Sequence, residues 1–505
     1  MLTSIREKAF FGCIQLEVIE FSDDSKLQTI DKYAFSYSKI KSIKIPSSVT
    51  SIGKNVLDNC GQLEVIEFSD DSKLQTIDRE AFSYSTIKCI KILPELVDLK
   101  EGWCSCISNL TKISVSTKNS RYCFFDEKMI IGKTNIEQSN YDCLVFCVRD
   151  IQRIKIPSFI EHICSHSFDY CKQLESIEFP DDSRLQTIKK SAFSSSTIKS
   201  IRIPSSVTSI GEYAFHYCIQ LQVVEIPDNS KLQSIDKNAF DLSQIKCIKI
   251  PLELVDLKEG WCSFTYNLTK ISVSPDNPRY FCYENKMIIG KSSIEQSNYD
   301  CLVFCVRDIQ RIKIPSFIEH ICSHSFDYCK QLESIEFPDD SKLQTIDKGA
   351  FYRSTIKRIR IQSSVTSIGE NAFYYCEQLE VVEIPDDSKL QTIDRDAFSY
   401  SIIKRIRIQS SVTSIGENAF DCCEQLEVIE IPDDSKLQTI DRDAFSYSKI
   451  KSIQIPSSVT SISEKAFCFC KNLHIIEIIS SEMISMCYTV FKDCKNVIVM
   501  IPVHS

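Results

Sequence analysis

The amino-acid sequence predicts a right-handed, curved α/β solenoid, in which short coils of similar sequence stack along one axis. The first observation is a repeat of 47 residues, which separates Pro157 from Pro204, Gln362 from Gln409, and Gln409 from Pro456. The second is an alternating apolar pattern in each half of the repeat, and the third is that neither half is long enough to form a core alone. We expect a parallel β-sheet on the concave face and short helical turns on the convex face.

Each 47-residue repeat contains a 23-residue unit and a 24-residue unit, as in Pro204–Ile226 followed by Pro227–Ile250. Leu63–Phe68 (LEVIEF) shows the strand of such a unit, because its apolar and polar residues alternate as in a strand with one buried face. An Ala-Phe pair follows an acidic residue in several units, for example after Asp78 and Asp394. Asp is a favoured N-cap, so this pattern predicts a short helical turn.

Two longer segments interrupt the repeats, at Leu93–Ile156 and Pro251–Ile314, and they are close copies of each other at an offset of 158 residues. Each begins as a 23-residue unit and then adds an insert that contains YDCLVFCVRDIQRIKI. Residues 479–505 form a degenerate repeat, which we expect to act as a weak C-terminal cap. The predicted organisation is a single solenoid over residues 1–505, with segments 93–156 and 251–314 as longer variant repeats.

The run IPSSVTSIG-x-x-AF-x-x-C-x-x-L-x-x-IEI resembles the BspA-like leucine-rich repeats, and the resemblance covers essentially the whole chain. The insert, SPDNPRY…NKMIIG…CLVF, also looks like the longer repeat variant of that family. Proteins of this family occur on the surface of anaerobic bacteria and of protozoan parasites. The resemblance therefore implies a leucine-rich-repeat solenoid without enzymatic activity or cofactor, acting as a surface antigen or adhesin that contacts host matrix proteins or cells.

The composition excludes several classes of protein. The chain of 505 residues is 43% hydrophobic and 25% charged, which is typical of a globular protein, and its net charge of −9 argues against a nucleic-acid partner. No apolar run reaches the ~18 residues of a membrane helix, and no signal peptide is visible at the N-terminus, so we expect no membrane insertion. The family resemblance implies a cell-surface or extracellular protein; the alternative is a cytoplasmic scaffold or inhibitor that binds a protein partner.

The strands of the two unit types carry opposite charges. The 23-residue units place Glu at two strand positions, and the 24-residue units place Lys or Arg at the same two positions. In a parallel, in-register stack with strands ~4.8 Å apart, each Glu would lie between two cations, which fixes the register. Such a charged face is alternatively a docking surface for a protein. Arg358 and Arg405 add a third cation in the C-terminal half, so the predicted contact residues are Glu333, Glu336, Lys357, Arg358, Arg360, Glu380, Glu383, Lys404, Arg405, Arg407, Glu427 and Glu430.

Eight of the 25 cysteines occupy one repeat position, where the 24-residue units carry Ser. Equivalent cysteines are two coils apart, roughly 9–10 Å, which exceeds the Cα separation that a disulfide requires. We therefore expect these thiols to be small buried side chains. In the inserts, pairing of Cys143 or Cys147 with Cys123 across a hairpin stays open for an exported protein, as does pairing of Cys282 in the second insert. The eight are Cys13, Cys60, Cys171, Cys218, Cys329, Cys376, Cys423 and Cys470.

Other candidate chemical sites are weak. His162-Ile-Cys164-Ser-His166 has the residue types of a zinc site, but no fourth ligand is evident, so we favour surface histidines on a convex turn. The Asp386-Asp387 pair recurs in most 24-residue units, as a turn requires, whereas a catalytic pair needs only one copy. The sequence therefore predicts no catalytic residue, no cofactor site and no metal site.

The N-terminus begins inside a repeat, because Leu2–Ile5 corresponds to Val49–Ile52. A first strand without a cap has an exposed edge. End-to-end self-association of the array is therefore among the expected partner interactions.

Overall fold

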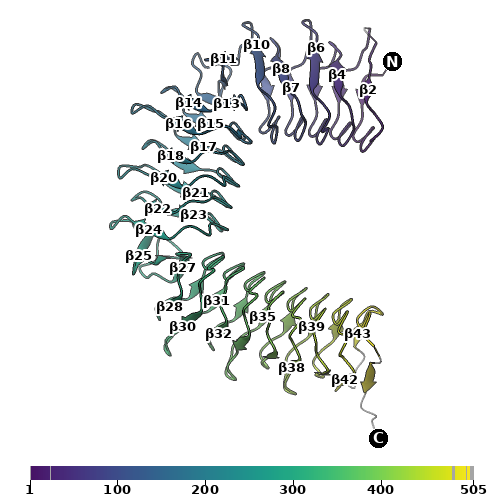
Figure 1. Ribbon diagram of the computed structural model, residues 1–505, viewed down its shortest axis with the longest axis vertical. Helices are drawn as coiled ribbons and strands as arrows, with labels where there is room; N and C mark the ends of the chain where they lie inside the picture. The colour runs from purple at the N-terminus through teal and green to yellow at the C-terminus, as the bar shows by residue number, and fades with distance from the viewer. Residues whose placement is uncertain (1, 23, 480–483, 496, 501–505) are drawn as a thin grey trace. The chain divides into compact units, whose positions relative to one another are not determined.

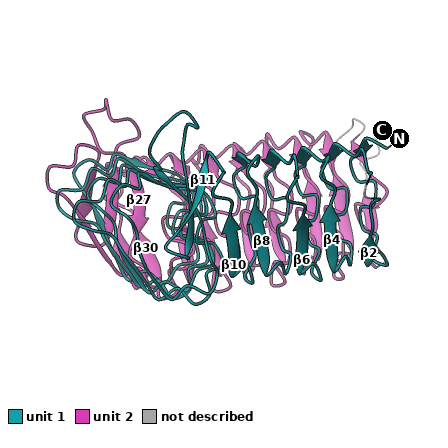
Figure 2. Ribbon diagram, turned by 90° about the horizontal axis from the view of Figure 1, so that it is seen from above, with its two compact units in different colours: residues 1–262 teal, residues 263–505 magenta. Residues whose placement is uncertain are grey.

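The computed structural model describes residues 2–22, 24–479, 484–495 and 497–500. It divides into two compact units, unit 1 over residues 1–262 and unit 2 over residues 263–505 (Figure 2). Within each unit the chain forms successive coils that lie beside one another (Figure 1). Each regular coil carries two strands, joined by turns. One strand belongs to a side of the coil that we call side A, and the other belongs to side B.

Side A consists of two-residue strands that pair in parallel with the next coil. In unit 1 the strands of side A are β1 (Ser4–Ile5), β3 (Thr29–Ile30), β5 (Ser51–Ile52), β7 (Thr76–Ile77), β9 (Asp98–Leu99), β15 (His162–Ile163), β17 (Thr187–Ile188), β19 (Ser209–Ile210), β21 (Ser234–Ile235) and β23 (Asp256–Leu257). In unit 2 they are β29 (His320–Ile321), β31 (Thr345–Ile346), β33 (Ser367–Ile368), β35 (Thr392–Ile393), β37 (Ser414–Ile415), β39 (Thr439–Ile440), β41 (Ser461–Ile462) and β43 (Ser485–Met486).

Side B carries the alternating segments that the sequence predicts as strands. In unit 1 its strands are β2 (Val18–Ile19), β4 (Ser42–Ile45), β6 (Val65–Phe68), β8 (Cys89–Ile92), β10 (Lys112–Val115), β14 (Arg153–Lys155), β16 (Ser176–Glu178), β18 (Ser200–Arg202), β20 (Val223–Glu225) and β22 (Cys247–Ile250). In unit 2 they are β24 (Lys270–Val273), β28 (Arg311–Lys313), β30 (Ser334–Glu336), β32 (Arg358–Arg360), β34 (Val381–Glu383), β36 (Arg405–Arg407), β38 (Val428–Glu430), β40 (Ser452–Ile455), β42 (Ile475–Ile478) and β44 (Ile498–Met500). Where they pair within a unit, these strands are parallel, and their isoleucines point inward.

The core of each unit is a row of stacked phenylalanine rings, from the Ala-Phe pairs and from the Ser-Phe pair that follows each insert. In unit 1, the rings of Phe168, Phe193, Phe215 and Phe240 have centroids 4.8, 5.1 and 5.2 Å apart, and consecutive rings are within 3° of parallel. The side chains are fully buried. The spacing of the rings is therefore close to the distance between neighbouring strands, ~4.8 Å.

The prediction of short helical turns after the side A strands is wrong, because the described residues contain no helix. Phe215 N–H donates to Ala239 of the next coil at 2.7 Å, whereas Ala214 N–H donates to Gly211 of its own coil at 3.1 Å. Positive φ at Tyr213 (55°) and at Tyr217 (54°) lets successive N–H groups of the turn point alternately to the next coil and to their own coil. An α-helix is about 10 Å wide and uses its own N–H groups internally, so it fits neither the spacing nor the bonds between coils.

The two inserts form antiparallel hairpins that then rejoin the stack. In unit 1, β11 (Tyr122–Phe125) pairs with β12 (Met129–Gly132), β12 pairs with β13 (Cys143–Cys147), and β13 pairs in parallel with β15. In unit 2, β25 (Tyr280–Tyr283), β26 (Met287–Gly290) and β27 (Cys301–Cys305) repeat this order.

The hairpin keeps its cysteines on separate strands. Cys123 lies opposite Ile131, and Cys143 lies opposite Gly132, so the whole of β12 separates the two thiols. The structure therefore does not support the pairing of Cys123 with Cys143, and all 25 cysteines are free thiols.

A buried ion pair fastens the insert of unit 1 to the coils on both sides. The Arg149 guanidinium is fully buried, lies 3.1 Å from Oδ1 of Asp169, and donates to the carbonyl oxygens of Ile107 at 3.0 Å and Ser167 at 2.8 Å. The second carboxylate oxygen of Asp169 accepts the backbone N–H of Cys106 at 3.0 Å. Arg149 thus satisfies carbonyl groups that the irregular turn would otherwise leave unpaired.

Substitution of Arg149 by Met should lower the free energy of unfolding by about 3–5 kcal/mol, because it leaves a buried carboxylate without its cation. Urea denaturation followed by circular dichroism measures the change. The matched control is Arg153→Met, since the Arg153 side chain is 79% exposed and its 3.6 Å ion pair with Glu175 should contribute less than about 1 kcal/mol. Equal effects of the two substitutions would contradict the role assigned to Arg149.

The predicted burial of the cysteine row is confirmed for every member except Cys13, which is half-buried. Each buried thiol in a regular coil lies against the serine of the preceding coil. The distances from Sγ to Oγ are 3.5 Å for Cys218 and Ser196, and 3.5 Å for Cys376 and Ser354. The thiols also contact the carbonyl oxygen of the Phe in the preceding coil, as Cys218 does with Phe193 at 3.0 Å. Burial raises the pKa of Cys218, Cys376 and Cys423 to about 12.

These thiols should resist labelling by a thiolate-specific disulfide reagent at pH 8, because a pKa near 12 leaves almost no thiolate at that pH. Cys487 should react first, since a hydrogen bond from Thr489 lowers its pKa. Peptide mass spectrometry at successive times measures the order, and urea should abolish it. Labelling of Cys376 as fast as Cys487 in the folded protein would show that the row is accessible.

Candidate interaction surface

Charged side chains line side B, and the strands bring them together in the predicted register. Arg360 lies opposite Glu383, and Arg407 lies opposite Glu430. Three residues earlier in each coil, Glu380 donates its backbone N–H to the carbonyl of Lys357 at 2.9 Å. We call the positions of Lys357 and Glu380 the upstream row, and the positions of Arg360 and Glu383 the downstream row. All twelve predicted contact residues are exposed. The alternation of acidic and basic rows across neighbouring coils is therefore confirmed.

The upstream row of charges forms ion pairs between neighbouring coils. Lys88 lies 2.7 Å from Glu64, and Lys451 lies 3.3 Å from Glu427. Arg311, at the strand position after this row, lies 3.3 Å from Glu333. Both partners of each pair are about half exposed or more. Pairs of this kind contribute at most about 1 kcal/mol each, so the row specifies the register more than it stabilises the fold.

The downstream row behaves differently, because its paired cations contact an Asp in the turn after the preceding coil's strand rather than the opposite Glu. Lys91 pairs with Asp70, and Arg407 lies 3.2 Å from Asp386. Arg405 reaches diagonally to Glu430 at 3.3 Å. Sequence reasoning treated Asp386 only as a turn residue. Its fixed distance from the preceding strand was the available signal for its place in the charge network.

Four cations, on β32 or directly before β32 and β36, have no such partner. Within the described ranges, no carboxylate lies within 4.0 Å of the side-chain nitrogens of Lys357, Arg358, Arg360 or Lys404. Between them, β34 contributes Glu383, Glu380 directly precedes β34, and Asp386 in the turn that follows pairs with Arg407. These four cations are therefore not neutralised by a direct ion pair within the described residues.

The same strands border an open groove of about 640 Å³. Val381, Val382 and Ile384 contribute apolar surface to it. The structure thus gathers six of the twelve predicted residues at one concavity and leaves Glu333, Glu336, Lys357, Arg358, Glu427 and Glu430 on the strands around it. The six in the groove are Arg360, Glu380, Glu383, Lys404, Arg405 and Arg407.

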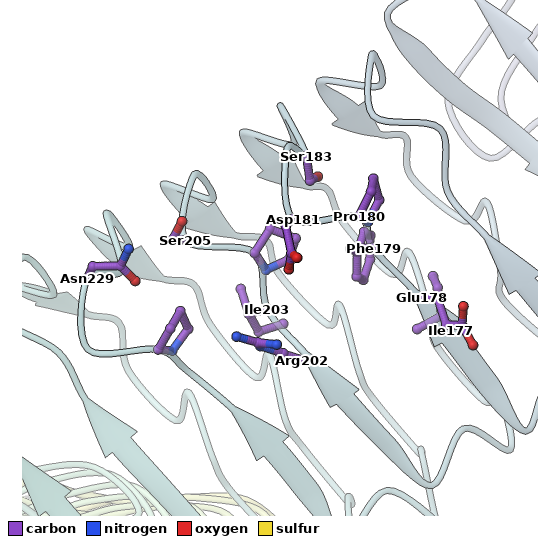
Figure 3. A pocket seen from close by; sticks show the side chains of 12 residues that line it. Ile177, Glu178, Phe179, Pro180, Asp181, Ser183, Arg202, Ile203, Ser205 and Asn229 are labelled. Carbon is purple, nitrogen blue, oxygen red and sulfur yellow. The ribbon is translucent and has the colours of Figure 1, made fainter.

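Unit 1 has a related groove of about 460 Å³ at the ends of β16 and β18 (Figure 3). Glu178, Asp181 and Arg202 line it together with the prolines of three successive turns. None of these positions was among the predicted contacts. Turns that begin with proline therefore border a groove on side B in both units.

The histidines of the His-Ile-Cys-Ser-His segment have ordinary partners. His162 lies on β15 rather than on a turn, and its Nδ1 lies 2.8 Å from the hydroxyl of Thr187. His166 Nδ1 lies 2.9 Å from Asp169. No set of three or more metal-ligating side chains converges anywhere in the described residues.

None of the described segments forms a helix of the length and apolarity that crossing a bilayer requires.

A search of curated proteins gives no significant match. Among solved structures, the pneumococcal vaccine antigen PcpA is 16% identical, with 72% of this chain and 94% of that chain covered and a TM-score of 0.51. A leucine-rich repeat protein from Eubacterium ventriosum is 17% identical, with 85% and 82% covered and a TM-score of 0.45. A leucine rich cell surface protein from Faecalibacterium prausnitzii is 20% identical, with 95% and 84% covered and a TM-score of 0.34.

The likeness to PcpA shows a shared solenoid fold and nothing finer at this level of identity. The family model described as the BspA type leucine rich repeat region, in six copies, matches residues 1–110, 139–269, 293–427 and 391–504. The matched ranges include the regular coils of both units and parts of both inserts. The chain therefore belongs to the BspA-type leucine-rich repeat family.

Proposed function

We propose that this protein is a non-enzymatic, protein-binding solenoid, and that the exposed strands β30 to β38 of unit 2 form its contact surface. The observation that carries the proposal is the set of four cations without a carboxylate partner beside the groove. Elsewhere on side B, Lys41, Lys88 and Lys451 pair with a Glu of the preceding coil. Among the described residues of unit 1, Lys199 and Lys246 have no carboxylate within 4.0 Å either, but no third cation lies beside them. Cations that are not neutralised within the chain remain available to the carboxylates of a partner, and they attract it at long range.

The finer proposal is a surface antigen or adhesin that contacts host matrix proteins or cells. Membership of the BspA-type family supports it. A second candidate, a cytoplasmic scaffold or inhibitor, is favoured by one observation, since all 25 cysteines are free thiols. Exported proteins more often oxidise their thiols.

Removal of the two extra cations should weaken binding to immobilised, solubilised basement-membrane matrix at least tenfold. Serine occupies the equivalent strand positions elsewhere, at Ser200 and Ser452, so the double substitution Arg358→Ser and Arg405→Ser fits the fold. Surface plasmon resonance at two salt concentrations measures the affinity.

The matched control removes two exposed cations from side B of unit 1, Lys155→Ser and Lys246→Ser, and changes the net charge equally. An equal loss from both double variants would indicate general charge attraction and would contradict a site on unit 2. Protease treatment of intact cells that express the native chain separates the two candidate locations, because complete protection would exclude the adhesin.

A further inference from the structure

A second cluster of side chains, on the turns that lead from side A to side B in unit 2, gathers tyrosines around one arginine. The guanidinium carbon of Arg353 lies 5.9, 5.8 and 4.7 Å from the ring centroids of Tyr328, Tyr352 and Tyr375. The Tyr375 ring stacks on that of Tyr400 at 4.2 Å. We call this set, with Tyr374 stacked on Tyr352 at 5.3 Å, the tyrosine ridge.

The fold does not require the tyrosine ridge. The same coils occur in unit 1 at an offset of 158 residues, where Ser194 and Ser195 stand in place of Tyr352 and Arg353. The backbone is the same in both, since φ is 57° at Ser195 and 54° at Arg353. In each copy the N–H of this residue donates to the next coil at 2.8 Å.

Two further positions of the ridge differ in the same way, because His216 replaces Tyr374 and Leu242 replaces Tyr400. The coils of unit 1 stack without these four side chains. Unit 2 therefore carries aromatic and cationic surface beyond what the packing of the coils needs.

Neither Arg353 nor the neighbouring Lys330 has an acidic partner among the described residues. Nε of Arg353 is buried without a hydrogen-bond partner, and no carboxylate of the described residues lies within 4.0 Å of its guanidinium. Lys330, 5.3 Å from the Tyr328 ring centroid, also has no such carboxylate. By contrast, Arg395 and Arg442 in later coils lie 3.1 and 3.2 Å from the Asp that follows each of them.

We propose that the tyrosine ridge binds an acidic segment of a partner protein, with an Asp or Glu carboxylate of that segment held by Arg353 and assisted by Lys330. Tyr and Arg are the side chains that contribute most to protein interfaces, because they bury large area at low entropic cost. The tyrosine rings hold the guanidinium plane in place, and its fork of donors fits a carboxylate. The ridge lies on different segments from strands β30 to β38, so either surface can fail alone.

Selection of a random dodecapeptide phage library on the full chain tests the proposal. Selected peptides should be enriched in Asp and Glu, and should bind the variant Tyr352→Ser, Arg353→Ser at least tenfold more weakly by fluorescence anisotropy. Replacement of Glu by Gln in a selected peptide should weaken binding comparably. The variant Lys155→Ser, Lys246→Ser, which removes two exposed cations from side B of unit 1, is the control and should bind the peptides as the native chain does. Peptides without acidic enrichment, or with unchanged affinity for the ridge variant, would overturn the proposal.

A gain of binding is the complementary test. Unit 1 already has Tyr170, Lys172 and Tyr217 at the positions of Tyr328, Lys330 and Tyr375. The substitutions Ser194→Tyr, Ser195→Arg, His216→Tyr and Leu242→Tyr should therefore build a second ridge and raise the peptide stoichiometry from one to two per chain in isothermal titration calorimetry. A stoichiometry that stays at one in the folded variant would show that these residues do not form the site.

Discussion

Hydrogen bonds between neighbouring coils are the constraint on which the rest of the structure depends. On side A, on side B and in the turns between them, backbone N–H groups donate to a neighbouring coil. Gly53 on side A donates to Ile30 of the preceding coil at 2.8 Å, and Phe215 in a turn donates to Ala239 of the next coil at 2.7 Å. This keeps the coils close to one strand spacing apart all the way round, within which phenylalanine rings stack at 4.8–5.2 Å in unit 1. The Ser–Cys row and the charged rows have the same origin, since residues at one repeat position lie beside each other in neighbouring coils.

The period and the strands of side B could be read from the sequence because they depend on patterns that recur in every unit. The two-residue strands of side A were not predicted. The register of side B could be predicted from the alternating charges, and it places Arg360 opposite Glu383. The absence of helical turns could not be predicted, because Asp-x-x-Ala-Phe has the local features of a capped helix. Hydrogen bonds to the neighbouring coil instead determine the backbone conformation of Phe215 and Tyr217. The local helix propensity of this segment was overridden by hydrogen bonds between coils, which the sequence of a single unit does not reveal.

Sequence reasoning located part of the candidate surface. The third cations, Arg358 and Arg405, pointed to the strands that border the groove of unit 2. The choice of ion pairs was not foreseeable, because Arg407 could reach either Glu430 or Asp386, and only the geometry of the turn favours Asp386. The tyrosine ridge was missed, although the comparison of Arg353 with Ser195 across the offset of 158 residues carried the signal.

The buried arginines have a consequence for how the array would respond to mechanical tension. In a solenoid each coil is held by its neighbours alone, so pulling at a terminus detaches coils one after another. Arg149 crosses from the coil before its insert to the coil after it, and the fully buried pair of Arg307 with Asp327 occupies the corresponding place in unit 2. Forced unfolding would pause where a buried ion pair must be removed from the apolar interior. It would therefore proceed in large steps that end at the Arg149–Asp169 pair and at the Arg307–Asp327 pair.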